Sequence, residues 1–231
     1  MCNNLSDNES NTSELPPDHE ARMERALLSL DGLSVGDAFG EGCFGSVRRM
    51  QRQELPPSPW CFTDDTAMAR SIVRCLNRYG HVDQDALAEA FAAEYQRNPH
   101  RGYGPMAQRI LLQIGSGTPW ADAAGRVFGG QGSCGNGGAM RSAPIGGYFS
   151  DDVLRTVAEA NASAEIRHTH PDGKTGAMAV ALAASGMVRE ASGIKKPGHA
   201  LIDFVLQHLP HTTGRDGIPA SWLAAREPIR F

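Results

Sequence analysis

The sequence predicts a single all-α domain, and two observations carry that prediction. Apolar residues recur at three- and four-residue spacing through most of the chain, which is typical of amphipathic helices. No segment shows the period-two alternation of a half-buried strand. The 231 residues, 41% of them hydrophobic, suffice for one core of ordinary size. We therefore expect one compact, orthogonal helical domain over residues 18–231.

The first half of the chain contains four predicted helices. The first runs from about Asp18 to Val35, and the second begins at Thr63. The third covers about 83–97, and the fourth begins at Pro105, a residue type favoured in the first helical turn. Apolar residues repeat at helical spacing in these four segments: Ala26, Leu27, Leu30 and Leu33; Met68, Ile72, Val73 and Leu76; Leu87, Phe91 and Tyr95; Ile110, Leu111 and Ile114.

The second half contains three further predicted helices. One begins at Ser150, where a serine and two aspartates resemble an N-cap with an acidic first turn. Residues 176–189 are almost all small or apolar, which predicts a helix buried on most sides. The last helix covers about 199–209. Three glycine-bearing segments are predicted to be loops: 36–48, 100–104 and 129–138.

Composition excludes several function classes. The net charge is -4, with 26 acidic and 22 basic residues in no long runs, so no basic stripe for nucleic acid is present. No apolar run approaches the roughly 20 residues that span a bilayer. Five scattered cysteines argue against a disulfide framework and favour reduced thiols in the cytoplasm. Residues 1–17 are polar and acidic, unlike a secretory signal, and are predicted to be a disordered lead-in.

The segment Trp60–Thr66, with the sequence WCFTDDT, carries the sharpest local signal. In one interpretation Thr63 is an N-cap and the two aspartates only complement the helix dipole. In the other, Asp64, Asp65 and the Thr63 hydroxyl converge at the end of the helix axis. Three such oxygens suit Mg²⁺ or Mn²⁺ and do not suit zinc. A cation would also relieve the repulsion between the two carboxylates.

The segment 129–141, GGQGSCGNGGAMR, is the second signal. Six glycines in the ten residues 129–138 let the backbone approach a ligand and expose N–H groups to it. A helix predicted to follow would add a positive N-terminus for a phosphate. The alternative is a flexible surface loop. The abrupt change to the MRSAPIG segment favours a packed structure.

A third signal is the pair of histidines in Arg167-His168-Thr169-His170-Pro171. No cysteine or carboxylate lies at zinc-ligand spacing from them, which makes a zinc site improbable. A histidine at the entrance of a buried helix, bonded to a ligand or to backbone, is the preferred interpretation.

Taken in order, five motifs resemble the ADP-ribosylglycohydrolase family. They extend over about 140 residues, and their order makes the match specific although each motif alone is weak. The five motifs are Gly36-Asp37-Ala38-Phe39-Gly40, Thr63-Asp64-Asp65-Thr66, Arg101-Gly102-Tyr103-Gly104, Gly135 to Arg141, and Thr169-His170.

The resemblance implies an all-α enzyme with a dinuclear Mg²⁺ or Mn²⁺ centre that removes ADP-ribose from a protein or a small molecule. Water activated at the metal would attack the anomeric carbon. Thr63, Asp64 and Asp65 would be metal ligands, and Asp64, Asp65 and Glu41 would be the catalytic residues. The ADP-ribose groove would be lined by Gly102, Tyr103, Gly104, Ser133, Cys134, Gly135, Asn136, Gly137, Met140 and His170.

Two departures from the family pattern affect the expected catalytic base and the expected metal site. Family members commonly carry a glutamate where this chain has Phe44, which leaves Glu41 as the nearest carboxylate. The closing D-x-D-T motif, which completes the metal site, is absent after Gly193, so we expect a partial metal site in a C-terminally incomplete domain. Three hypotheses remain: an ADP-ribosyl hydrolase, a relative that binds ADP-ribose without hydrolysing it, and a helical interaction protein without a ligand.

Overall fold

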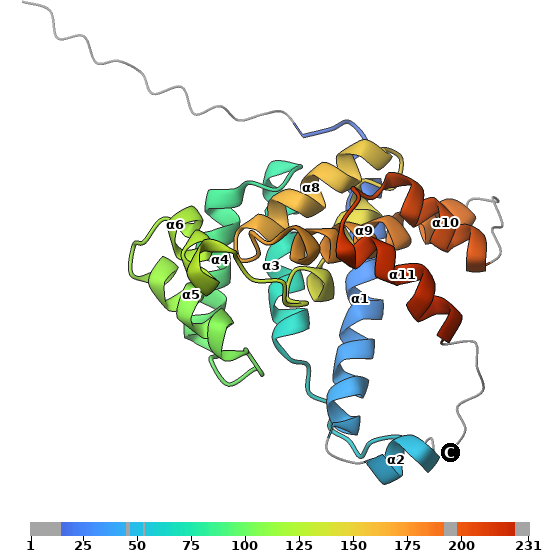
Figure 1. The fold of residues 1–231 in the computed structure, drawn as a ribbon, viewed down its shortest axis with the longest axis horizontal. Coiled ribbons are helices and arrows are strands. Elements are labelled where there is room, and N and C mark those ends of the chain that lie inside the picture. The colour runs from blue at the N-terminus through green and yellow to red at the C-terminus, as the bar shows by residue number, and fades with distance from the viewer. Residues whose placement is uncertain (1–14, 45–46, 53, 192–197, 225–231) are drawn as a thin grey trace, which may run out of the picture.

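The structure is a computed structural model that describes residues 15–44, 47–52, 54–191 and 198–224 (Figure 1). Throughout these residues the regular structure is helical and no strand occurs, which confirms the all-α prediction. The elements are α1 (His19–Cys43), α2 (Val47–Arg52), α3 (Asp64–Tyr79), α4 (Gln84–Arg97), α5 (Pro105–Gly115), α6 (Trp120–Gly125), η1 (Val127–Gly130), η2 (Ala139–Arg141), α7 (Ala143–Tyr148), α8 (Val153–Glu165), α9 (Pro171–Ala191), α10 (Gly198–His208) and α11 (Thr213–Ala224).

The main core lies where α1, α3, α7, α8 and α9 pack together. In Figure 1, α4, α5 and α6 lie on one side of this centre, and α10 and α11 lie on the other. Helix α9 contacts α7 closely, because a Cβ on Gly146 would collide with the Ala181 carbonyl. The predicted burial of the alanine-rich helix is confirmed by Ala177, Ala181 and Leu182, which are fully buried.

Local capping signals set the starts of α3 and α4. The Thr63 hydroxyl accepts a hydrogen bond from the Asp65 N–H over 3.3 Å, and Asp83 accepts one from the Ala86 N–H over 2.9 Å. Both are N-cap contacts, which satisfy N–H groups that have no partner within the helix. Helix α3 ends at Gly80, whose φ of 70° is readily adopted only by glycine. The starts of α3 and α4 agree with the sequence prediction.

The prediction that α1 ends near Val35 and gives way to a loop over 36–48 is wrong. Helix α1 continues to Cys43, and α2 begins at Val47. Gly36 and Gly40 lie in open positions of α1, and Asp37 between them is held by the first turn of α3. These tertiary contacts outweigh the low helix propensity of the glycines, about 1 kcal/mol each.

The predicted cap of α8 is displaced by two residues. Asp152 is the N-cap and accepts a hydrogen bond from the Arg155 N–H, whereas Asp151 pairs with Arg22 of α1. Helices α2, α6, α7 and α11 were not expected from periodicity; three of them have only six residues. Such short helices span less than two turns and show no clear amphipathic repeat.

Residues 1–14 of the predicted lead-in and residues 225–231 lie outside the described part of the chain. Among the described helices, none combines the length and the apolar character that crossing a bilayer requires.

Candidate functional site

The start of α3 and the end of α1 enclose a cavity of about 470 Å³. We call it the carboxylate cavity, because Asp64 and Asp65 of α3 and Glu41 of α1 line it together. The sequence-predicted residues Thr63, Gly102 and Asn136 lie on the same walls. The remaining lining residues come from α1 and its end: Gly36, Asp37, Gly40 and Phe44.

Asp37 organises the start of α3 from the neighbouring helix. Its carboxylate accepts hydrogen bonds from the Thr63 N–H over 2.8 Å and from the Thr63 hydroxyl over 2.7 Å. It also accepts from the Thr66 N–H over 3.2 Å and from the Thr66 hydroxyl over 2.6 Å. Asp37 was not among the predicted site residues, although the Gly-Asp-Ala-Phe-Gly motif contained the signal. Four donors occupy its oxygens, so Asp37 positions the site and is not a free ligand.

Asp64 and Asp65 carry raised pKa values. Burial is the main cause for both carboxyls. The negative charges of Asp37 and Asp64 add to the effect on Asp65 and raise its pKa to about 6. No lysine or arginine in the described residues forms an ion pair with either carboxylate. The folded chain thus holds two crowded carboxylates whose repulsion a bound cation would relieve.

Two buried arginines lie behind Asp64. Arg141 is fully buried and Arg167 is 4% exposed. The Arg141 guanidinium donates to the Ser163 carbonyl over 2.9 Å and lies 4.5 Å from the centre of the Phe91 ring. Burial lowers the pKa of Arg167 to about 10, and the charge of Arg167 opposes the rise in the Asp64 pKa. Sequence reasoning assigned neither arginine a role, because nothing local indicates that a charged residue is buried.

The donor chemistry of the cavity fits one face of a hard-cation site. Thr63, Asp64 and Asp65 supply hydroxyl and carboxylate oxygens, which Mg²⁺ and Mn²⁺ prefer. Within the described ranges, however, no group of three or more His, Cys, Asp or Glu side chains could hold a metal ion. The residues at hand therefore fit part of a metal site, in which water would complete the coordination.

Gly102 lies directly against the carboxylates. Its φ of 86° favours glycine, and a Cβ at this position would lie 3.5 Å from Asp64 Oδ1. The Asp64 N–H donates to the Arg101 carbonyl over 2.6 Å, which fixes this turn to the start of α3. The Tyr103 ring points into the core, 4% exposed and edge-on to Tyr95. Only the backbone of Tyr103 is therefore placed to contact a ligand, while Gly104 lies outside as the N-cap of α5.

The glycine loop is anchored to the protein at Gly132 and Gly137, whereas residues 129–131 and 134–136 are exposed. A Cβ on Gly132 would collide with Thr169, and a Cβ on Gly137 would lie 2.8 Å from His168 Nε2. The Ser133 hydroxyl accepts a hydrogen bond from the Gly135 N–H over 3.2 Å. The loop thereby presents Cys134, Gly135 and Asn136, which are exposed.

Two details of the loop region differ from expectation. The loop is followed by the three-residue turn η2 and the six-residue helix α7, so no long helix directs its N-terminus at the loop. His170 does not line the carboxylate cavity; its Nδ1 accepts a hydrogen bond from the Asp172 N–H at the start of α9. Met140 is partly buried against the core.

His168, next to the loop, is neutral. Burial and the charges of Arg141 and Arg167 lower its pKa to about 3.

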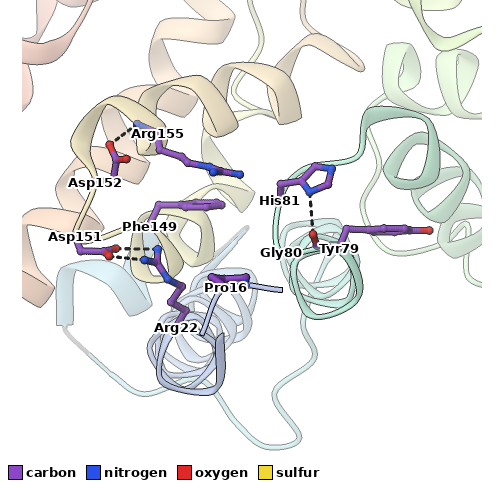
Figure 2. A pocket seen from close by; sticks show the side chains of 9 residues that line it. All are labelled: Pro16, Arg22, Tyr79, Gly80, His81, Phe149, Asp151, Asp152 and Arg155. Atoms are coloured by element: carbon purple, nitrogen blue, oxygen red, sulfur yellow. Dashed lines mark hydrogen bonds and ion pairs between the residues drawn. The ribbon is translucent and has the colours of Figure 1, made fainter. Parts of the chain in front are cut away.

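A larger cavity of about 540 Å³ lies elsewhere and is shown in Figure 2. We call it the arginine cavity, because Arg22 and Arg155 line it. The Arg22 guanidinium forms two hydrogen bonds with the Asp151 carboxylate, one of them 2.9 Å long, and Arg155 pairs with Glu159 over 3.2 Å. Both cations are thus neutralised within the protein. None of the predicted site residues lines this cavity, and size alone does not make it the functional site.

Comparisons with known proteins agree with the geometry. The model of the ADP-ribosylglycohydrolase family matches residues 18–229. ADP-ribosylhydrolase ARH3 of Gallus gallus is 40% identical over 164 residues, which are 70% of this chain and 42% of the relative. The Homo sapiens protein of that name is 34% identical over 226 residues, covering 88% of this chain and 60% of the relative.

A bacterial relative extends the match. The ADP-ribosyl-[dinitrogen reductase] glycohydrolase of Rhodospirillum rubrum is 29% identical over 164 residues, covering 64% of this chain and 52% of the relative. The chain spans about half the length of the curated relatives it matches. Since the family model covers nearly the whole sequence and four of the five motifs meet at one cavity, the chain belongs to the ADP-ribosylglycohydrolase family.

Proposed function

We propose that this chain hydrolyses the bond between the anomeric carbon of ADP-ribose and an acceptor group on a protein or a small molecule. The observation that carries the proposal is the carboxylate cavity, where Asp64 and Asp65 of α3 share one space with Asn136 of the glycine loop. The names of the relatives, ADP-ribosylhydrolase and ADP-ribosyl-[dinitrogen reductase] glycohydrolase, support the same class of substrate.

In this proposal each part of the site has its own task. The exposed backbone of residues 134–136 binds the diphosphate through the N–H groups of Cys134 and Asn136, since the Gly135 N–H donates to the Ser133 hydroxyl. Asp64 and Asp65 accept hydrogen bonds from the ribose hydroxyls and hold the anomeric carbon in the cavity. Mg²⁺ or Mn²⁺, held by Thr63, Asp64 and Asp65, would orient the ribose hydroxyls and lower the pKa of a water molecule beside the anomeric carbon.

Glu41 is the residue that we assign as general base. It lines the carboxylate cavity one helical turn after Asp37. In the reaction the oxygen of a water molecule forms a bond to the anomeric carbon while the bond to the acceptor breaks. Glu41 accepts a proton from the water and passes it to the departing acceptor, which restores the Glu41 carboxylate. The products are ADP-ribose and the unmodified acceptor.

A second candidate function is binding of ADP-ribose without hydrolysis. Two observations favour it over an unrelated activity. The described residues hold no complete metal cluster, and Phe44, 84% exposed, lines the cavity at the place of the family glutamate. The glycine loop and the carboxylates would still form a groove, which would bind the ligand weakly.

We place the proposed activity in the cytoplasm, with no nucleic acid or membrane as partner. Cys43, Cys61, Cys75 and Cys134 are all free thiols, which suits a reducing compartment. The net charge of -4 supports a partner other than nucleic acid.

The test is release of ADP-ribose from peptides modified on serine and, separately, on arginine, with excess Mg²⁺. The double variant Asp64→Ala, Asp65→Ala is the blank, and Asp122→Ala, an exposed aspartate of α6, is the matched control. Turnover that the blank abolishes and the control retains supports the hydrolase. Calorimetric binding of ADP-ribose without turnover favours the second candidate. Absence of both contradicts the two proposals together.

A further inference from the structure

A second, smaller cavity adjoins the carboxylate cavity. Its volume is about 300 Å³, and it shares three lining residues, Glu41, Thr63 and Gly102, with its neighbour. We call it the side cavity. Its other walls are formed by two short segments that are distant in sequence: Cys61 and Phe62 before α3, and Asn98, His100 and Arg101 after α4.

The two cavities lie in a definite order relative to the glycine loop. Asn136 lines the carboxylate cavity, and no residue of the 129–138 loop lines the side cavity. The shared residues Glu41, Thr63 and Gly102 stand between the two spaces. A ligand with its diphosphate on the loop and its ribose at Asp64 and Asp65 therefore has the side cavity beyond the ribose. The group bonded to the anomeric carbon would extend into that space.

Arg101 makes the wall of the side cavity rigid. Its carbonyl accepts the Asp64 N–H over 2.6 Å, and its guanidinium donates to the Phe62 carbonyl over 2.8 Å. The guanidinium carbon also lies 3.8 Å from the centre of the Phe62 ring. The wall and the carboxylates thus belong to one fixed unit, and a ligand in the side cavity would be held in register with the reacting ribose.

Arg101 is the donor-rich group of the side cavity. The Arg101 guanidinium has five N–H groups, of which the described residues accept one. The Asn98 amide and the His100 ring each add a donor beside an acceptor. Among the described residues, Glu41, on the shared wall, is the only acidic one that lines the side cavity. Such a set suits carbonyl and carboxylate oxygens. A peptide offers both, in its backbone and in an acidic side chain.

We propose that the side cavity is an acceptor subsite, which binds the peptide segment next to the ADP-ribosylated side chain and favours an acidic over a basic residue there. This inference rests on the proposed function and adds the class of acceptor: a peptide, in preference to a small leaving group.

Two exposed thiols allow the binding to be observed without relying on turnover. Cys61 lines the side cavity, and Cys134 lies on the glycine loop. Alkylation of each thiol by iodoacetamide is followed by mass spectrometry of its own proteolytic peptide. The chain is labelled alone, with ADP-ribose, and with a large excess of a serine-ADP-ribosylated peptide that carries glutamate next to the serine. We expect ADP-ribose to slow labelling of Cys134 only, and the modified peptide to slow labelling of both thiols.

A kinetic comparison tests the donors. Asn98→Ala and His100→Ala should each raise KM for the modified peptide by about fivefold, the equivalent of one side-chain hydrogen bond. KM and kcat for ADP-ribosyl-serine without flanking residues should not change. Asn77→Ala and His199→Ala, exposed positions that line neither cavity, are the matched controls.

The outcomes separate this inference from the proposed function. Protection of Cys134 by ADP-ribose, with no added protection of Cys61 by the peptide, overturns the acceptor subsite and leaves the proposed function standing. A lower KM for a peptide with lysine in place of glutamate overturns the acidic preference. Protection of neither thiol by ADP-ribose, together with no turnover, overturns both.

Discussion

The carboxylate cavity and the arginine cavity have similar sizes but differ in whether their charged side chains are paired. In the arginine cavity, Arg22 is paired with Asp151 (Figure 2), and Arg155 is paired with Glu159 of its own helix. In the carboxylate cavity, Asp64 and Asp65 have no such partner among the described residues, and their pKa values are raised. The unpaired carboxylates of Asp64 and Asp65 lower the free energy of unfolding, because they repel one another and are partly buried.

The unpaired carboxylates indicate that the carboxylate cavity, and not the arginine cavity, is the ligand-binding site. Paired charges need no further partner, whereas partly buried like charges with raised pKa values are typical of functional sites. Asp37 has two effects on this site. Its hydrogen bonds hold the first turn of α3 in place, and its negative charge adds to the repulsion on Asp65. Four predictions follow from the contrast between the cavities, in order of decreasing effect.

Asp37→Ala should have the largest effect on stability. It removes the acceptor of four hydrogen bonds from Thr63 and Thr66. Bonds to a charged acceptor contribute about 1.5 to 3 kcal/mol each, and water replaces some of them, so we expect a loss of about 3 kcal/mol. Urea unfolding measures it. The matched control is Asp31→Ala, an exposed aspartate on the same helix, which should stay within about 0.5 kcal/mol of the parent. A loss below about 1 kcal/mol for Asp37→Ala would contradict the positioning role.

Asp65→Asn should stabilise the metal-free chain near neutral pH. The Asp65 pKa is about 6 in the folded chain, against 3.8 as the ordinary value. Between these values the folded state binds more protons than the unfolded state, so the free energy of unfolding falls as pH rises. At 1.36 kcal/mol per pKa unit, and after a reduction for partial exposure to solvent, we expect a cost of about 1 to 2 kcal/mol above pH 6.

The variant should therefore be more stable than the parent by about that amount at pH 7, and the two should converge near pH 4. Urea unfolding in the presence of a chelator measures the difference. Asp151→Asn, which lies in the arginine cavity, serves as the control and should lose stability slightly instead. If the parent instead gained stability relative to Asp65→Asn as the pH rises from 4 to 6, the predicted direction of the pH dependence would be wrong.

Phe44→Glu should strengthen cation binding. Phe44 lines the carboxylate cavity, so a glutamate there would add a carboxylate to Thr63, Asp64 and Asp65. We expect the parent to bind Mg²⁺ in the millimolar range, equivalent to about 4 kcal/mol, because the described residues supply few ligands. The variant should bind about tenfold more tightly, a gain of about 1.4 kcal/mol. Calorimetry with Phe44→Gln as the neutral control separates charge from shape. Micromolar binding by the parent would reveal ligands beyond those identified.

The Arg22–Asp151 pair should contribute least. Its carboxylate is half exposed, and exposed pairs usually contribute about 0.2 to 1 kcal/mol. A double-mutant cycle with Arg22→Ala and Asp151→Ala should give a coupling energy in this range. Neither variant should change the release of ADP-ribose. A loss of activity confined to these variants would move the functional site to the arginine cavity.

Features that are encoded within one helical turn could be predicted from the amino-acid sequence. The N-cap at Thr63 and the acidic first turn after it define the start of α3, because capping depends on neighbouring residues. The apolar repeats likewise identified α3, α4 and α5. The family motifs also named Asp64, Asp65, Gly102 and Asn136, which the structure brings to one cavity.

Features that depend on contacts between distant segments could be seen only in the three-dimensional structure. The acceptor of the Thr63 hydroxyl proton is Asp37, 26 residues earlier in the chain, and no local pattern links the two. The same contact keeps α1 helical through Gly36 and Gly40, against their propensity. Packing also turned the Tyr103 ring into the core and buried Arg141 and Arg167 behind Asp64. The reason is that burial is a property of the assembled helices, whereas a motif specifies only which side chains are available.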